Sequence, residues 1–299
     1  MTNRTGGDAL SVRSDAAMEI SRQDASLGAV VTGVRLAELT DVEWADIERA
    51  FHDHAVLVFP GQHLTSAEQV EFARRFGSIE TLAEGYDAVP ISTVDRSGTV
   101  MEPDHPLMQV VRGNQGWHTD SSYMPVSAKA SMLTAKVVTA TGGETEWADM
   151  RAAYDALDDA MRSRISGLCA YHSIVYSQTK AGFDSTVGYG TEEQAQLRPL
   201  VKVHPATRRP SLFIGRHAHA IPTLTSDESE ALLDDLLAWA CQPPRIYRHR
   251  WEPGDLVVWD NRCVLHRACE WDLDEPRVMR HTRIAGDPAT ESAVGSAGR

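Results

Sequence analysis

A histidine and an aspartate that could bind one metal ion lie two residues apart, at His118 and Asp120. None of the other histidines among the twelve in the chain has an acidic residue two positions later. Residues i and i+2 of a β-strand point to the same face, so this spacing predicts an imidazole and a carboxylate side by side. The alternative is a structural histidine hydrogen-bonded to a neighbouring aspartate, and the pair alone does not decide between the two.

His266 is a candidate third ligand, because it ends a short apolar segment that follows the turn at 260–262. Two histidines and one carboxylate form the facial triad that leaves positions open on Fe(II) for substrate and oxygen. Cys263 and Cys269 flank His266 at three-residue spacings, but a structural zinc site would need a second pair of thiolates, which the neighbouring sequence lacks. A zinc hydrolase that uses the same three ligands stays open as an alternative.

The elements that must position these residues are mostly strands. Many short apolar segments bounded by turn residues predict a mainly β fold with flanking helices, of the barrel or jelly-roll type. Helices are expected at 40–54 and 65–76, where each begins with a capping-box spacing, and at 226–239. In the second half, strands are expected at 168–176, 246–249, 256–259, 264–266 and 278–284, together with a hairpin over 200–215.

We expect one domain over residues 17–286, preceded by a flexible leader at 1–16 and followed by a disordered tail at 287–299. Residues 78–107 are irregular and rich in Gly, Pro, Asp and Thr. A loop of this length in a compact domain is usually functional or mobile, which makes it a candidate lid over the site. A surface insertion without a role is the alternative.

The composition of the 299 residues, with 42% hydrophobic and 24% charged side chains, is that of an ordinary globular protein. The net charge of -13 argues against a general nucleic-acid binder and against a protein held on an anionic membrane. A small anionic substrate remains compatible, because a local arginine cluster can hold one. The four cysteines are too few for a disulfide framework and no signal peptide is recognisable, so we expect a reducing, cytoplasmic setting.

Further motifs occur in a fixed order around the candidate ligands. They are Gly113-Asn114-Gln115, Thr141-Gly142-Gly143-Glu144-Thr145-Glu146, Asp149-Met150-Arg151-Ala152-Ala153-Tyr154, Leu212-Phe213-Ile214-Gly215, Tyr247-Arg248-His249-Arg250-Trp251, Gly254-Asp255-Leu256, Trp259-Asp260-Asn261-Arg262 and Arg277-Val278-Met279-Arg280. In this order and spacing, nearly the whole chain resembles the taurine dioxygenase and 2,4-dichlorophenoxyacetate dioxygenase (TauD/TfdA) family of Fe(II)/2-oxoglutarate-dependent oxygenases.

The resemblance implies a double-stranded β-helix, a cupin-like jelly roll, with Fe(II) held by His118, Asp120 and His266. It also implies 2-oxoglutarate as co-substrate, with its distal carboxylate on Thr145 and Arg277, and O2 as oxidant. The planar fork of an arginine suits a carboxylate, and a hydroxyl adds one hydrogen bond. 2-Oxoglutarate would be converted to succinate and CO2 while a C–H bond of the substrate is hydroxylated. Halogenation is not expected, because related halogenases lack the carboxylate ligand.

The run from Tyr247 to His266 is similar to the aryloxyacetate branch of the family, which implies a small, anionic, aryloxyalkanoate-like acid as substrate. Hydroxylation beside the ether oxygen would then cleave the ether. A natural-product tailoring oxygenase that hydroxylates, desaturates or epoxidises is the alternative within the same chemistry, and a non-catalytic β-barrel binder is a more remote one. Many relatives are dimers or tetramers, which implies a homo-oligomer, whereas no nucleic-acid or membrane partner is expected.

Five residues are candidates for the substrate pocket: Asn114, Arg216, His217, His219 and His281. His217 and His219 could also form a metal pair, but no carboxylate accompanies them. His281 lies four residues after Arg277, where taurine dioxygenase has a substrate-binding arginine. A histidine is shorter and is charged only at lower pH, so taurine is not the expected substrate.

Overall fold

The computed structural model describes residues 17–81, 87–183 and 195–295, and the expected leader at 1–16 lies outside these ranges. Within the described residues the largest sheet has seven strands, which run antiparallel to their neighbours except for β2 and β3. Their spatial order is β1 (Glu19–Arg22), β2 (Ala29–Thr32), β3 (Val56–Phe59), β13 (Leu256–Asp260), β5 (Ala130–Val137), β15 (Val278–Ile284) and β4 (Val89–Ser92).

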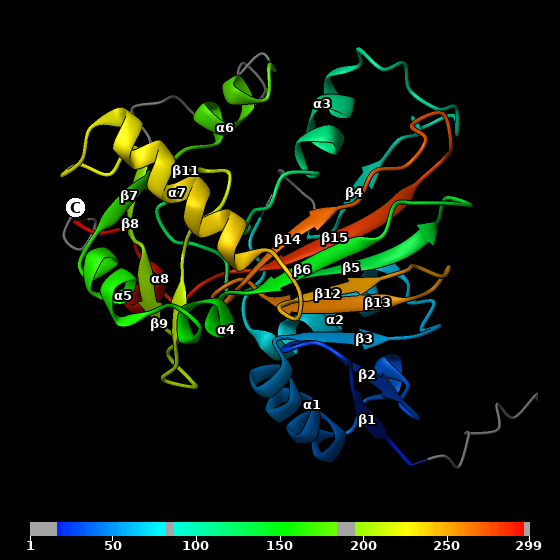
Figure 1. Ribbon diagram of the computed structural model, residues 1–299. Helices are drawn as coiled ribbons and strands as arrows, with labels where there is room; N and C mark the ends of the chain where they lie inside the picture. Colours follow the sequence, from blue (N-terminus) through cyan, green and yellow to red (C-terminus); the bar gives the residue numbers. More distant parts are fainter. Residues whose placement is uncertain (1–16, 82–86, 184–194, 296–299) are drawn as a thin grey trace, which may run out of the picture.

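A smaller sheet lies beside the large one (Figure 1) and is formed by β12 (Ile246–His249), β6 (Thr145–Asp149) and β14 (Val264–Ala268). Aromatic side chains fill the space between the two sheets. Trp147 from β6 and Trp259 from β13 are fully buried, with ring centroids 5.8 Å apart, and Tyr247 stacks on Trp147. Two antiparallel sheets packed over a shared core confirm the predicted jelly roll.

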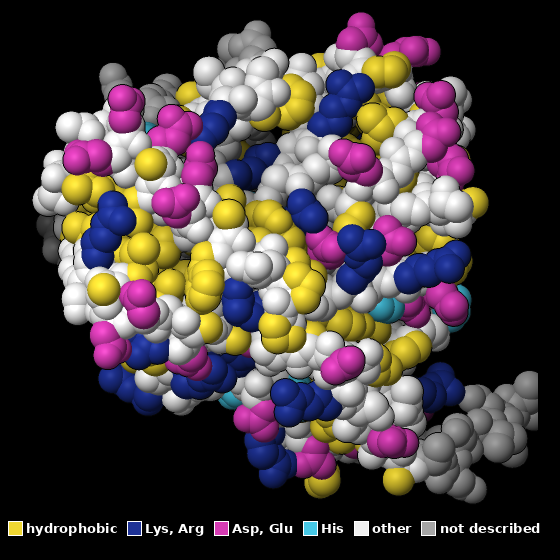
Figure 2. Space-filling view, viewed as in Figure 1, with side chains coloured by type: hydrophobic (Ala, Val, Ile, Leu, Met, Phe, Trp, Pro, Cys, Tyr) yellow, Lys and Arg dark blue, Asp and Glu magenta, His cyan; other side chains and the backbone are white. Residues whose placement is uncertain are grey.

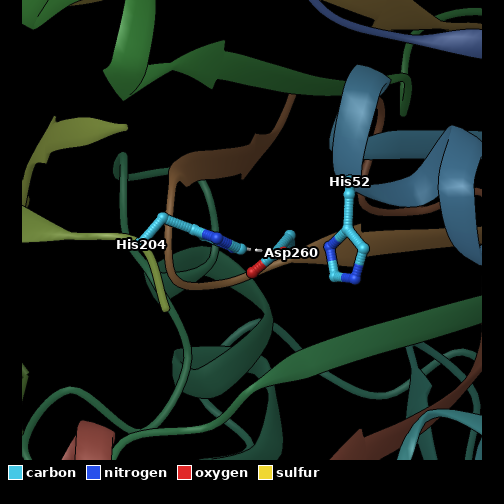
Figure 3. A group of neighbouring side chains, drawn as sticks. All are labelled: His52, His204 and Asp260. Carbon is cyan, nitrogen blue, oxygen red and sulfur yellow. Dashed lines mark hydrogen bonds and ion pairs between the residues drawn. The ribbon is translucent and has the colours of Figure 1, made fainter. Parts of the chain in front are cut away.

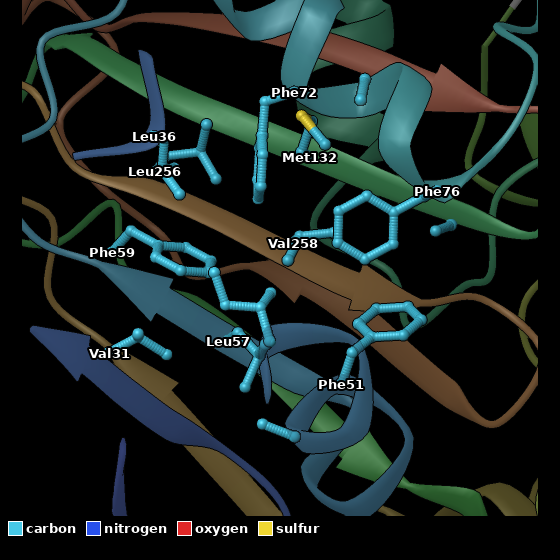
Figure 4. Packing of buried hydrophobic residues seen from close by; sticks show 14 of the residues in the cluster. Val31, Leu36, Phe51, Leu57, Phe59, Phe72, Phe76, Met132, Leu256 and Val258 are labelled. Atoms are coloured by element: carbon cyan, nitrogen blue, oxygen red, sulfur yellow. The ribbon is translucent and has the colours of Figure 1, made fainter. Parts of the chain in front are cut away.

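Helices α1 (Asp41–His54) and α2 (Ser66–Phe76) cover the opposite face of the large sheet. Four phenylalanines hold them there, namely Phe51, Phe59, Phe72 and Phe76, each at most 4% exposed (Figure 4). The rings of Phe59 and Phe72 meet edge to face at 5.6 Å. Because side chains alternate along a strand, β13 can place Leu256 in this cluster and Val257 in the core between the sheets.

Both helices begin with the capping boxes that the sequence predicted. Thr40 accepts a hydrogen bond from the backbone N–H of Glu43 (3.3 Å), and the Glu43 carboxylate accepts one from the N–H of Thr40 (2.8 Å). Thr65 and Glu68 repeat the arrangement at the start of α2. Each box satisfies two backbone donors that a helix start leaves unpaired.

The remaining elements form a layer around a third apolar cluster and carry several cavity-lining segments. Helices α4 (Met150–Asp155), α5 (Asp159–Ile165) and α7 (Ser226–Ala240) pack with β11 (Ala218–His219), β7 (Cys169–His172), β8 (Gln196–Pro199) and the hairpin of β9 (Val201–Val203) and β10 (Pro210–Leu212). Helices α3 (Pro106–Gly113) and α6 (Ile174–Lys180) lie on one side of the molecule (Figure 1). No helix in the described ranges is long and apolar enough to cross a membrane.

The strands expected at 246–249 and 278–284 are confirmed with the same bounds, but three other expectations were wrong. The 78–107 segment was expected to be irregular, but it contains the strand β4, and α3 begins at its end. Pro90 is tolerated in β4 because this strand lies at the edge of the sheet. The strand expected at 168–176 stops at His172, since Ser173 caps α6 by accepting a hydrogen bond from the N–H of Tyr176 (3.0 Å).

The third wrong expectation is the disordered tail. Residues 287–295 are packed onto the fold and include α8 (Pro288–Glu291). The side chain of Glu291 is buried, forms an ion pair with Lys202 and accepts a hydrogen bond from Ser127 (3.1 Å). A buried, paired carboxylate fixes this segment, although its composition is that of a loose tail.

Candidate functional site

The two candidate histidine ligands face each other across a single antiparallel bridge. The backbone N–H of His118 donates to the carbonyl oxygen of His266 (3.0 Å), and the N–H of His266 donates to that of His118 (2.8 Å). This exchange places the two imidazole centroids 4.1 Å apart. His266 lies in β14, whereas the strand expected around His118 is reduced to this bridge because Asp120 already begins a turn.

Asp120 is positioned by contacts with the turn that follows β13 and with β5. Its backbone N–H donates to Oδ1 of Asn261 (3.3 Å), and the hydroxyl of Thr119 donates to the carbonyl oxygen of Asn261 (2.8 Å). Ser131 donates to Oδ2 of Asp120 (2.6 Å), and Nε2 of His266 lies 3.8 Å from the same oxygen. The carboxylate is therefore held on the side that faces the two histidines.

Ligand atoms of His118, Asp120 and His266 all lie within 4.8 Å of one another, close enough to bind one ion. Nδ1 of His118 donates to the carbonyl oxygen of Gly116 (2.7 Å), which leaves the lone pair on Nε2 for a metal. The donor set of two imidazole nitrogens and one carboxylate oxygen is the one that non-haem Fe(II) uses. The residues present therefore fit this metal.

The protonation states also fit a metal site. Burial lowers the pKa of His266 to about 4 and that of His118 well below its ordinary value, so both imidazoles are neutral at pH 7. Burial opposes ionisation of Asp120, but Arg283, then His266 and His281, outweigh it and hold the pKa of that carboxyl well below its ordinary value. A divalent metal requires neutral imidazoles and an ionised carboxylate.

The three side chains line a cavity of about 340 Å³, called the catalytic cavity below. Arg277 lines one wall and is only 5% exposed. Its Nη2 donates to the carbonyl oxygen of Gly143 (3.1 Å), and its guanidinium lies 4.8 Å from the ring of Trp271. Burial lowers the pKa of Arg277 to about 10, so it stays charged at pH 7, yet no acidic side chain in the described ranges forms an ion pair with it. A buried cation without an acidic partner suits the binding of an anion.

Thr145 lines the same cavity as this arginine, with its hydroxyl hydrogen available. Its Oγ1 accepts a hydrogen bond from the indole N–H of Trp251 (2.9 Å), so the hydroxyl can donate to an anion in the cavity. In the β6–β14 register Thr145 is paired with Ala268, two residues from His266. Two residues of a strand span about 7 Å, which separates the anion receptor from the metal-type cluster.

Arg216 is a second charged group in the same cavity and comes from the segment after β10. Its backbone N–H donates to the carbonyl oxygen of Trp117 (2.8 Å), and Nη1 donates to that of Gly113. Burial lowers its pKa to about 10, which still leaves it positive, and no ion pair with an acid joins it within the part of the chain that the structure describes. Two charged arginines without carboxylate partners thus share one cavity with the His-Asp-His cluster.

The other predicted pocket residues differ in position. Asn114, at the C-terminus of α3, and His217 line the catalytic cavity. His217 is kept neutral by burial, which lowers its pKa well below the ordinary value, and it donates from Nδ1 to Ser177 (2.8 Å). His219 does not line this cavity: it stacks on Tyr176 at 4.4 Å and lines a neighbouring one. Its prediction as a residue of the catalytic pocket is corrected accordingly.

His281 lines the catalytic cavity but is directed at the metal-type cluster. Its Nε2 lies 3.5 Å from Oδ2 of Asp120, and its ring is parallel to that of Trp259 with centroids 6.1 Å apart. It therefore contacts the Asp120 carboxylate, which lies on the side of the metal-type cluster. Arg283 contacts the same carboxylate through its other oxygen (Nη2 to Oδ1, 3.3 Å).

Residues 19–283 match the family described as "Taurine catabolism dioxygenase TauD, TfdA family". The chain belongs to this family.

Named relatives of this TauD/TfdA member include the (S)-phenoxypropionate/alpha-ketoglutarate-dioxygenase of Sphingobium herbicidovorans, which is 52% identical over 93% of this chain and 98% of the relative. The alpha-ketoglutarate-dependent 2,4-dichlorophenoxyacetate dioxygenase of Cupriavidus pinatubonensis is 38% identical over 83% of this chain and 91% of its own. Among solved structures, AAD-2 in complex with Mn(II) and N-oxalylglycine matches with a TM-score of 0.85 and 38% identity, over 94% of this chain and all of that one.

Some cavity residues of this family member were missed from the sequence. Gln178 lies on α6, which the sequence did not predict, and its buried Oε1 has no hydrogen-bond partner within the described ranges. Trp271 lies under Arg277 in an irregular segment that carries no recognisable signal. Tyr123, whose ring lies 5.0 Å from His217, could have been found, because it follows the candidate ligands by three residues.

A second cluster, formed by His52, His204 and Asp260, also has metal-type spacing. Two of its members, His204 and Asp260, are already hydrogen-bonded without an ion, whereas the buried Nδ1 of His52 has no partner in the described ranges. Nδ1 of His204 accepts two backbone N–H groups (3.2 and 3.0 Å), so its proton is on Nε2, which donates to Asp260 (3.0 Å). Figure 3 shows this bond, with His52 projecting from α1 toward the same carboxylate. Asp260 also binds Arg262 through both oxygens. The cluster instead supports the turn whose Asn261 holds Asp120.

Proposed function

We propose that this TauD/TfdA family member oxidises 2-aryloxyalkanoates, with (S)-2-phenoxypropionate as the first compound to test. The chain is an Fe(II)- and 2-oxoglutarate-dependent dioxygenase, as the family and its 52% identical relative indicate. One observation carries the assignment of its site. The His118–Asp120–His266 cluster shares one cavity with two charged arginines that lack carboxylate partners in the described ranges. The reaction needs two organic anions in one cavity, the co-substrate and the substrate, and each has a carboxylate that one of these arginines could bind.

In this proposal His118, Asp120 and His266 hold Fe(II). Arg277 and Thr145 bind the distal carboxylate of 2-oxoglutarate, because a buried guanidinium and a hydroxyl with a free hydrogen match two carboxylate oxygens. The strand spacing of about 7 Å between this receptor and His266 suits the length of a five-carbon dicarboxylate. When bound, Fe(II) and 2-oxoglutarate supply the O2-dependent oxidation of a C–H bond, with release of succinate and CO2.

Arg216 holds the carboxylate of the primary substrate. A charged, bidentate donor in a largely enclosed cavity orients a small acid and excludes neutral analogues. Apolar side chains that line the same cavity can receive the aryl ring: Ile91, Leu107, Val110, Val111 and Ile174. His281 acts on Asp120 and not on the substrate, so the anion is held from the Arg216 wall.

The chemistry of an aryloxyalkanoate determines the products. Hydroxylation of the carbon between the carboxylate and the ether oxygen of 2-phenoxypropionate gives a hemiketal. The hemiketal loses phenol and leaves pyruvate, so the ether bond is broken without hydrolysis.

Fe(II) and free thiols both suit a reducing compartment, which supports a cytoplasmic location. A dimer or tetramer stays a prediction.

The test combines binding and turnover. Anaerobic addition of Fe(II) and 2-oxoglutarate should give a weak visible charge-transfer band, and (S)-2-phenoxypropionate should then stimulate release of succinate and phenol in air. His266→Ala should abolish the band while the protein stays folded. Succinate release that no aryloxyalkanoate stimulates would reject the substrate assignment, and the natural-product tailoring alternative would then be screened with larger apolar acids. Absence of the band in metal-loaded protein would reject the site itself.

A further inference from the structure

The side chain of Arg216 passes between two cavities. One is the catalytic cavity, and the other, of about 710 Å³, is called the second cavity here; both are lined by Gly113 and Arg216. The second cavity also has Arg112, Tyr176, Lys180 and Leu233 in its walls. Figure 2 shows this face of the molecule hollowed between α3 and the α6–α7 layer, with basic side chains in the hollow. The Arg216 side chain therefore has two places that it can occupy.

Two glycines leave the space in which the side chain lies. A Cβ atom on Gly113 would lie 2.9 Å from Nη1 and 3.3 Å from Nη2 of Arg216, and a Cβ on Gly116 would lie 2.9 Å from its Cδ. Non-bonded atoms 2.9 Å apart overlap, so any other residue at either position would displace the guanidinium or its stem. Gly113 and Gly116 are together called the glycine slot.

Backbone conformation does not explain these glycines. Neither has the positive φ that favours glycine in the described turns. Gly113 ends α3 in helical conformation, where alanine would stabilise the helix. Space for Arg216 is the constraint that remains.

The slot matters because little else fixes the guanidinium. Nη1 donates to the carbonyl oxygen of Gly113, whereas the buried Nε has no hydrogen-bond partner in the described ranges. Arg216 nevertheless lines the same cavity as His118 and Asp120. A long, flexible side chain that is held by one hydrogen bond needs a steric guide to present its charge in one direction.

We propose that Gly113 and Gly116 determine the specificity of the enzyme for anionic substrates by holding Arg216 toward the catalytic cavity. This inference rests on the proposed role of Arg216 as the receptor of the substrate carboxylate. In a variant without the slot, the guanidinium turns into the second cavity, and the catalytic cavity loses its positive charge on that wall. The fold tolerates the change, because the atoms displaced belong to a flexible side chain, its end at Gly113 and its Cδ at Gly116.

The test measures dissociation constants by calorimetry on anaerobic protein loaded with Fe(II) and 2-oxoglutarate. The probes are (S)-2-phenoxypropionate and its neutral primary amide. Gly113→Ala and Gly116→Ala should each weaken binding of the acid about tenfold or more, the loss expected for a charge-assisted hydrogen bond. Binding of the amide should change less than about twofold, and the melting temperature should not fall. In an Arg216→Ala background, adding Gly113→Ala should have no further effect on the acid.

Three results would count against the inference in different ways. Unchanged binding of the acid in both glycine variants, with a loss in Arg216→Ala, would overturn the glycine slot alone. Unchanged binding in Arg216→Ala would overturn the anion receptor of the proposed function as well. Equal weakening of the acid, the amide and 2-oxoglutarate in the glycine variants would show that the whole cavity had moved, which also overturns the slot.

Discussion

Replacing Arg277 by methionine should stabilise the metal-free protein and at the same time weaken 2-oxoglutarate binding. Burial lowers the pKa of Arg277 from 12.5 to about 10. At about 1.4 kcal/mol for each tenfold change in a proton dissociation constant, the fold disfavours this charge by roughly 3 kcal/mol at neutral pH. In the proposed function this charged group binds the distal carboxylate of 2-oxoglutarate, so its cost in stability is the cost of that binding site.

Other contacts reduce the expected gain. Methionine fills a similar volume but removes the hydrogen bond to Gly143 and the cation–π contact with Trp271, which contribute about 1 kcal/mol each. The net increase in the free energy of unfolding is therefore about 1 kcal/mol, or roughly 2 °C in melting temperature for a chain of this size. Removing one partner of a buried charge pair costs about 2 kcal/mol or more, so the Kd of 2-oxoglutarate should rise at least about 30-fold.

The assay pairs urea denaturation of metal-free protein with anaerobic titration of the chelate band. Arg277→Lys keeps the charge but loses the planar fork, so it should bind 2-oxoglutarate more weakly than the parent without becoming more stable. Arg49→Met, at an exposed arginine, should change neither quantity. A loss of more than about 2 kcal/mol of stability in Arg277→Met, or unchanged 2-oxoglutarate affinity, would refute the reasoning.

Three further outcomes are expected. Thr145→Val should raise the Kd of 2-oxoglutarate about tenfold and leave the Trp251 N–H without its acceptor, whereas Thr145→Ser should bind normally; equal titrations for both would exclude the hydroxyl contact. His172 is buried and its pKa is well below 6.5, mainly through burial, so its contribution to stability is present above about pH 6.5 and is lost as the pH falls below that value. His172→Phe should flatten the fall in the free energy of unfolding, measured by urea denaturation between pH 7 and 5.5, by up to about 1.4 kcal/mol per pH unit, and an unchanged slope would contradict this. Glu291→Gln should lower the melting temperature by several degrees because Lys202 is left buried and unpaired; no change would mean that α8 is not docked in solution.

The local sequence determined a large part of the fold. The capping boxes at Thr40 and Thr65 start their helices where the spacing predicted, because the bonds that make them are formed within four residues. The buried strand β13 was recognisable from its apolar run. Segments whose structure depends on distant partners were not recognisable. The Glu291 segment is ordered by Lys202, and β4 by pairing with β15.

The sequence by itself also named the residues that could bind a metal and a co-substrate. His118 and Asp120 are identified by their spacing, and His266, Thr145 and Arg277 by motifs, because these depend on residue type and order along the chain. It could not say which arginines are free to bind an anion. Arg262 is neutralised by Asp260 and Arg283 contacts Asp120, whereas Arg277 has no such partner in the described ranges.

Only the tertiary structure decided these points, for a physical reason. The charge that a side chain offers to a ligand depends on whether another charge lies within a few ångströms, and those neighbours come from distant parts of the chain. Folding turned His281 toward Asp120 and placed His219 outside the catalytic cavity. Folding also placed the Arg216 side chain against Gly113 and Gly116. Because these two residues have no side chains, they leave the space in which the guanidinium is held toward the catalytic cavity.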